Sequence, residues 1–161
     1  MSAGTSSGGL TVSRDLSQLA PRFRAAVESA IADCQKRGLD AYVYEAYRSL
    51  ELQALYYERG RTVIPPIKPV TYAKSNLYSW HGYGLAVDVI SRRHGWDRPE
   101  SWFRDVAESF RKFNCKWGGD WKTKDLPHFQ WGACKASPSD RARELFAQGG
   151  VAAVWNAVGA D

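Results

Sequence analysis

A turn leads into a strand in the stretch Ser79-Trp80-His81-Gly82-Tyr83-Gly84-Leu85-Ala86-Val87-Asp88. The two glycines predict a flexible turn, and the apolar run Leu85–Ile90 predicts a strand. Asp88 interrupts this run seven residues after His81. An ionised carboxylate among apolar neighbours is costly unless it is paired, hydrogen-bonded or bound to a metal. Asp88 therefore requires a partner.

A second short strand, His128–Trp131, follows Pro127. Alternation along this strand directs Phe129 and Trp131 into the core and the His128 imidazole into a cleft. Two imidazoles and one carboxylate suit Zn²⁺, and three protein ligands leave the fourth position open for water. His81, Asp88 and His128 are therefore candidate zinc ligands. The spacing alone also allows each histidine to be an ordinary core or surface residue.

Asp125 lies three residues before His128, so a second carboxylate is expected near the metal without binding it. A carboxylate in that place can act as general base, taking a proton from water and passing it to a leaving amine. The alternative is a loop aspartate paired with Lys122 or Lys124.

Arg48 lies at the end of a predicted strand, Ala41–Tyr47. Its planar guanidinium could bind a substrate carboxylate or a developing oxyanion. An ion pair with Glu45 or Glu51 is the competing interpretation. His94 lies in a polar stretch, and we expect it to be exposed and without a role.

The remaining pattern predicts helices around these strands. A long amphipathic helix is expected over Leu16–Lys36, a second over Leu50–Arg59, and a third beginning at Pro99. A long surface loop follows the second helix, over Arg61–Tyr78. Further expected elements are a strand over Cys115–Trp117 and two short helical stretches, Asp140–Ala147 and Val151–Val158, joined by two glycines. This order predicts an α+β domain with a small, mainly antiparallel sheet flanked by helices.

Composition narrows the classes of function. The chain has 161 residues, with 22 Lys and Arg against 17 Asp and Glu, and its length fits one domain. Its net charge of +5 favours anionic partners. The sequence contains no run of five like charges, so binding to nucleic acid is not predicted. No apolar run is long enough to span a membrane. Cys34, Cys115 and Cys134 are odd in number and lack CxxC spacing, so reduced thiols are expected.

The two ends of the chain differ from the middle. Residues Met1–Gly9 lack the basic and apolar regions of a Sec signal peptide, so we expect a short disordered arm and synthesis in a cytoplasm. Residues 10–135 form the expected main domain, and residues 136–161 an extension. Packing of this extension on the main domain is expected. The alternative is an amphipathic segment that contacts an anionic envelope transiently.

The residues around His81 resemble a known family. Ser79 to Asp88 matches the Ser-x-His-x-x-Gly-x-Ala-x-Asp motif of the LAS zinc peptidases, which include lysostaphin-type enzymes, D-alanyl-D-alanine peptidases and the hedgehog signalling domain. Further pieces of the resemblance follow in order: Tyr47-Arg48-Ser49, Gly118-Gly119-Asp120-Trp121 and Asp125-Leu126-Pro127-His128-Phe129. Together they cover residues 41–131.

One position resembles a particular branch of this family. D-alanyl-D-alanine enzymes typically have Glu where this chain has Asp125, and the aspartate resembles the L-alanyl-D-glutamate endopeptidases, many of them bacteriophage endolysins. The resemblance implies zinc held by His81, Asp88 and His128, with Asp125 as base. It also implies that Arg48 is a catalytic residue that contacts the substrate or the transition state, and Ser79 is a further candidate for substrate binding. Many relatives have Glu where Gln130 stands, but no ligand role attaches to that position.

The resemblance implies a monomeric zinc endopeptidase that cuts the L-alanyl-D-glutamate bond of peptidoglycan stem peptides, as a phage enzyme lysing its host at the cell wall. The nearest alternative is a D-alanyl-D-alanine carboxypeptidase. A non-haem iron oxygenase with two histidines and one carboxylate is another. A zinc-containing binding module without turnover is the third, and the presence of both Asp125 and Arg48 argues against it.

Overall fold

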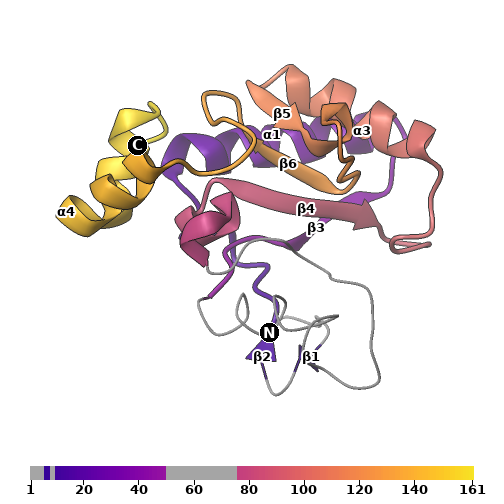
Figure 1. The fold of residues 1–161 in the computed structure, drawn as a ribbon. Helices are drawn as coiled ribbons and strands as arrows, with labels where there is room; N and C mark the ends of the chain where they lie inside the picture. The colour runs from indigo at the N-terminus through magenta and orange to yellow at the C-terminus, as the bar shows by residue number, and fades with distance from the viewer. Residues whose placement is uncertain (1–5, 8–9, 50–75) are drawn as a thin grey trace.

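The computed structural model describes residues 6–7, 10–49 and 76–161 (Figure 1). The helix predicted over Leu50–Arg59 and nearly all of the loop predicted over Arg61–Tyr78 lie outside the described residues, as does most of the arm predicted over Met1–Gly9. At the N-terminal end, the two-residue strands β1 (Ser6–Ser7) and β2 (Leu10–Thr11) pair antiparallel.

Four antiparallel strands form the central sheet, in the order β3-β4-β6-β5. Their bounds are β3 (Ala41–Glu45), β4 (Ala86–Ser91), β6 (His128–Trp131) and β5 (Cys115–Trp117). The predicted α+β class with a small antiparallel sheet is therefore confirmed. Strand β3 ends two residues earlier than predicted, because the Ala46 N–H donates to the Ser13 carbonyl outside the sheet (2.6 Å).

Helices α1 (Pro21–Lys36) and α3 (Glu100–Arg111) lie together along one face of the sheet (Figure 1). The single helix predicted over Leu16–Lys36 is wrong at its start, where Leu16–Gln18 forms a separate 3-10 helix. Pro21 explains the break, because proline disfavours helical backbone in the preceding residue, and Ala20 is extended (φ −54°, ψ 138°). Pro99 likewise precedes α3 as its N-cap instead of forming its first residue.

One face of β4 and β6 is apolar, whereas the other carries ionisable side chains. Val87 pairs with Phe129 in the register of the two strands, and the Phe129 ring stacks on Phe110 of α3 with centroids 4.3 Å apart. Asp88 pairs with His128 one residue further along. Since successive side chains of a strand point to opposite faces, Asp88 and His128 lie side by side on the face away from the helices.

The chain ends in α4 (Asp140–Ala157), which bends at Gly149 and Gly150. Gly150 has φ 69°, so two helical stretches meet at this pair of glycines, as the sequence predicts. The Trp155 indole donates to the Tyr83 carbonyl (2.6 Å), and the Trp131 indole donates to the Val158 carbonyl (2.7 Å). In the part of the chain that the structure describes, no helix is long and apolar enough to cross a membrane.

Candidate metal centre

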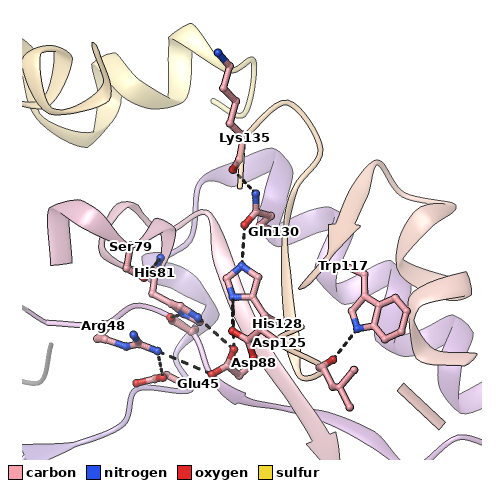
Figure 2. Close-up of polar contacts among 12 residues, drawn as sticks. Glu45, Arg48, Ser79, His81, Asp88, Trp117, Asp125, His128, Gln130 and Lys135 are labelled. Carbon is pink, nitrogen blue, oxygen red and sulfur yellow. Dashed lines mark hydrogen bonds and ion pairs between the residues drawn. The ribbon is translucent and has the colours of Figure 1, made fainter. Parts of the chain in front are cut away.

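Three side chains from three separate elements meet on the face of the sheet that points away from α1 and α3 (Figure 2). His81 comes from the 3-10 helix Trp80–Tyr83, Asp88 from β4 and His128 from β6. Asp88 Oδ1 lies 3.3 Å from His81 Nε2 and 3.8 Å from His128 Nδ1. One ligand atom from each residue lies within 4.8 Å of the other two. The structure thus brings together the three residues predicted as zinc ligands.

The segment that carries His81 is a 3-10 helix, Trp80–Tyr83, where the sequence predicts a flexible turn. Ser79 caps the 3-10 helix, its hydroxyl accepting a hydrogen bond from the His81 N–H (3.3 Å). Gly84 ends the helix with φ 69°, and a Cβ at this residue would lie 2.5 Å from the Gln18 carbonyl oxygen. The glycine is therefore required for close packing and for a left-handed backbone.

The ring orientation of His81 is fixed by the main chain. His81 Nδ1 lies 2.9 Å from the Ala46 carbonyl oxygen, which can only accept a hydrogen bond. Nδ1 therefore carries the donated proton, and Nε2 faces Asp88. A ligand histidine typically binds its metal through one nitrogen while the other donates to such a carbonyl.

His128 is oriented by a side chain. Its Nε2 lies 2.8 Å from Gln130 Oε1, and its Nδ1 faces Asp88 and Asp125. The cluster therefore presents Nε2 of one imidazole, Nδ1 of the other and a carboxylate oxygen to one point, and this donor set fits Zn²⁺.

The three groups titrate in different directions. Burial acts to raise the pKa of Asp88, but His81, His128 and Arg48 outweigh burial and hold this pKa at about 2. Burial and the neighbouring His81 lower the pKa of His128 to about 4. Burial and Arg48 act to lower the pKa of His81, yet Asp88 and Glu45 outweigh them and leave it above its ordinary value. At neutral pH, Asp88 is ionised and His128 is neutral.

Asp125 lies at the edge of the cluster, with Oδ2 3.9 Å from His128 Nδ1 and its side chain 52% exposed. Burial of part of the carboxyl and the nearby Asp88 charge raise the pKa of Asp125 to about 6. The alternative of a lysine partner is not found among the described residues, where Lys124 instead pairs with Glu100 (3.0 Å). Asp125 therefore lies beside the cluster, while its role as a base stays a prediction.

Arg48 and Ser79, predicted to contact substrate, both lie beside the cluster. Arg48 is buried, and its Nη2 lies 2.8 Å from Glu45 Oε1 and 4.0 Å from Asp88 Oδ2. The competing ion pair with Glu45 is thus present, while Glu51 lies outside the described residues. Ser79 caps the helix of His81. Contact of either residue with substrate stays a prediction.

Two neighbours of the site were not assigned a catalytic or binding role from the sequence. Glu45, considered there only as an ion-pair partner of Arg48, is 2% exposed and lies opposite Asp88 in the register of β3 and β4. Trp121 packs against His128 with ring centroids 4.9 Å apart. Its place at the end of the Gly118-Gly119-Asp120-Trp121 motif was the signal available in the sequence.

The other reactive side chains lie elsewhere. All three cysteines are buried and unpaired, as expected. Burial raises the pKa of Cys115 and of Cys134 to about 12, so neither thiol is a nucleophile near neutral pH. His94 is exposed, as expected.

The known proteins to which this chain is similar are named as peptidases. A family described as D-alanyl-D-alanine carboxypeptidase matches residues 73–131, a span that contains the three clustered residues. The peptidoglycan L-alanyl-D-glutamate endopeptidase CwlK of Bacillus subtilis is 33% identical over 71% of this chain and 74% of its own length. The L-alanyl-D-glutamate peptidase of Listeria phage A118 is 25% identical over 73% of this chain, which spans 39% of the phage protein.

Solved structures share the fold. The LD-carboxypeptidase LdcB is 18% identical with a TM-score of 0.53, over 81% of this chain and 64% of its own. VanYB, solved with D-alanine-D-alanine, is 16% identical with a TM-score of 0.53, over 86% of this chain and 82% of its own. The identity to the Bacillus enzyme over most of both chains shows the relationship by descent. The chain therefore belongs to the D-alanyl-D-alanine carboxypeptidase-like family of peptidases.

Proposed function

We propose that this peptidase is a zinc-dependent peptidoglycan endopeptidase that hydrolyses the L-alanyl-D-glutamate bond of stem peptides. The observation that carries the proposal is the cluster of His81, Asp88 and His128 with Asp125 at its edge, 3.9 Å from His128 Nδ1. The name of the Bacillus relative, 33% identical, supports this choice of bond.

His81, Asp88 and His128 would hold the zinc ion. Their fit rests on two imidazole nitrogens directed at one carboxylate oxygen, each ring oriented by a hydrogen bond from its other nitrogen. Zinc bound there supplies a Lewis acid that polarises the scissile carbonyl and makes water more acidic. Asp88, with its pKa held at about 2, contributes a full negative charge over the whole range of physiological pH.

Asp125 is the proposed general base. With its pKa at about 6, the carboxyl is mostly ionised at neutral pH and still basic enough to take a proton from the attacking water. The same oxygen then gives this proton to the nitrogen of the leaving D-glutamate as the carbon–nitrogen bond breaks. Half of the Asp125 side chain is exposed, so it can reach both water and substrate.

We place Arg48 and Ser79 on the substrate side of the reaction. The Arg48 guanidinium lies 4.0 Å from Asp88 and is kept in place by Glu45, so a developing oxyanion near the cluster would meet a positive charge. Ser79 lies next to Trp80 at the start of the helix that carries His81, where its hydroxyl would contact the bound peptide.

The biological role of this peptidase, lysis of a bacterial host, is also a proposal. The phage relative supports a lysis enzyme that acts on the bacterial cell wall, although the chain spans 39% of that protein. The family description favours a second candidate, a D-alanyl-D-alanine carboxypeptidase. The two differ in product, since an endopeptidase releases a peptide that begins with D-glutamate and a carboxypeptidase releases free D-alanine.

Digestion of purified peptidoglycan followed by mass spectrometry tests the proposal. We expect muropeptides that retain L-alanine alone, together with released peptides carrying a new amino-terminal D-glutamate. The Asp125→Asn variant, with the same fold and zinc content, is the matched control. Release of D-alanine with the L-alanyl bond intact would establish the carboxypeptidase instead, and zinc binding with no product would establish a binding module.

A further inference from the structure

We propose that Gln130 is a positioning residue that keeps His128 in the tautomer able to bind a metal, and that the Lys135 carbonyl links Gln130 to the helix carrying His81. Gln130 is 1% exposed and lies two residues beyond His128 in β6. Its functional meaning rests on the zinc site proposed above.

The orientation of the Gln130 amide follows from its acceptors. Gln130 Nε2 donates to the Lys135 carbonyl oxygen at 2.6 Å and lies 3.4 Å from the Cys134 carbonyl oxygen. Both carbonyls can only accept, so the amide nitrogen must face them. The amide oxygen must then face His128, as Figure 2 shows.

This orientation selects one tautomer of His128. Gln130 Oε1 can only accept a hydrogen bond, so the proton of the neutral imidazole is required on Nε2, 2.8 Å away. Nδ1 is then left with a lone pair, 3.8 Å from Asp88 Oδ1. Since a metal binds the unprotonated nitrogen, Gln130 prepares His128 to coordinate through Nδ1.

A single carbonyl connects this arrangement to the second histidine. The Lys135 oxygen also accepts a hydrogen bond from the indole Nε1 of Trp80 (2.7 Å), and Trp80 directly precedes His81. The two lone pairs of this oxygen are thus used by Gln130 and by Trp80. The turn before Lys135 is fixed by the Cys134 N–H, which donates to the Trp131 carbonyl (3.0 Å).

The same geometry explains why an amide suits this position better than an acid. A glutamate would keep an oxygen facing His128, but its second oxygen would face two carbonyl oxygens and could donate to neither. A leucine would remove both interactions. Gln130→Glu therefore removes only the hydrogen bond to Lys135, and Gln130→Leu removes the hydrogen bond to His128 as well.

The experiment uses the full chain without metal, labelled with ¹⁵N-histidine, at pH 8, where the His128 imidazole is neutral. Long-range ¹H–¹⁵N correlation spectra distinguish the two tautomers of each ring. We expect His128 to be protonated on Nε2 in the unsubstituted protein and in Gln130→Glu. In Gln130→Leu we expect a mixture of tautomers, and zinc affinity lower by about 10- to 100-fold in competition with a chelator. Gln35→Leu, on the exposed side of α1, is the matched control.

A folded Gln130→Leu variant with His128 still protonated only on Nε2 would overturn the proposal, and so would a change of tautomer in Gln130→Glu. If the leucine variant does not fold, the glutamate variant decides alone. The Lys135 link is tested by Trp80→Phe, which should shift the ring signals of His81 and the amide signals of Gln130; unchanged Gln130 signals would overturn it. The tautomer is read without zinc or substrate, so this test stands even if peptidoglycan is not cleaved.

Discussion

The two histidines of the cluster are held in opposite ways. His81 lies on a short 3-10 helix and bonds to a main-chain carbonyl, that of Ala46, whereas His128 lies on a regular strand and bonds to a side chain, that of Gln130. Their electrostatic surroundings also differ, since the pKa of His81 is raised and that of His128 is lowered to about 4. A main-chain carbonyl cannot be removed by substitution, so His128 is the histidine of the cluster whose hydrogen-bonding anchor a mutation can remove.

Removal of a ligand is the largest change we predict. His81→Ala, Asp88→Ala and His128→Ala should each lose zinc and with it all measurable peptidoglycan hydrolysis, because a catalytic site with three protein ligands has none to spare. Metal analysis of the purified variants checks this, against about one zinc per chain in the unsubstituted protein.

The opposite face of the same strands supplies the control. Phe110→Leu alters the stacking on Phe129 and should cost about 0.5 to 3 kcal/mol of stability while leaving the zinc content unchanged. Full activity of any ligand variant after exhaustive chelation would contradict the assignment of a zinc centre.

The sequence predicts the strand that carries His128 better than it predicts the helix that carries His81. Strand β6 has the bounds that alternation predicts, because Phe129 and Trp131 fill the core and leave His128 and Gln130 on the other face. The two glycines in the segment of His81 predict only a turn, whereas the structure has a 3-10 helix there. This helix contacts distant groups, among them the Trp155 indole and the backbone of Gln18, which local sequence does not reveal.

The hydrogen bonds around the cluster illustrate the same limit. The pairing of Asp88 and His128 across β4 and β6 agrees with the family resemblance, whereas their spacing alone left it open. The Arg48–Glu45 pair, three residues apart, was one of two interpretations that the sequence allowed. The role of Gln130 depends on the Lys135 carbonyl, five residues away across a turn, and patterns of residue types do not predict how such a turn closes.

The next largest effect is expected at Asp125. Asp125→Asn should lower kcat by about 10²- to 10⁴-fold, the usual contribution of a positioned base, while zinc content and fold stay nearly unchanged. Steady-state kinetics with a soluble muropeptide, beside metal analysis, checks both parts. Loss of zinc in this variant would make Asp125 a ligand, and unchanged turnover would assign the proton transfer to another group.

The pH dependence of the reaction gives a second measure of the same residue. The pKa of Asp125 is raised to about 6, so its base form is lost as the pH falls through 6, and activity should fall with it. The charge of bound zinc moves this loss to lower pH, toward the ordinary carboxyl value. This fall in activity at acidic pH should be absent from the pH profile of Asp125→Asn.

A smaller effect is expected at Arg48. Arg48→Lys keeps the charge but not the planar pair of donors, and should lower kcat/KM by about 10- to 100-fold, the equivalent of one hydrogen bond to a charged group. Glu45→Gln is the companion variant, because it weakens the buried pair while residue 48 remains an arginine. Normal kcat/KM in a folded lysine variant would reduce Arg48 to a structural partner of Glu45.

The smallest effect we predict is a count of protons, and it compares the two histidines directly. Zinc binding displaces any proton held by a ligand nitrogen. At pH 5.5, an ordinary histidine is about 90% protonated, so two of them would release nearly two protons.

The raised pKa of His81 keeps it protonated in the metal-free protein, while His128, with its pKa at about 4, and Asp88, at about 2, carry almost none. Asp125, with its pKa at about 6, would add a proton of its own, so the count is made on the Asp125→Asn variant. From that variant zinc should release about one proton, measured by calorimetry in buffers of different ionisation enthalpy. At this pH, water in the site stays protonated and adds nothing to the count. Release close to two would mean that burial does not keep His128 neutral, and release close to zero would mean that Asp88 does not hold a proton on His81.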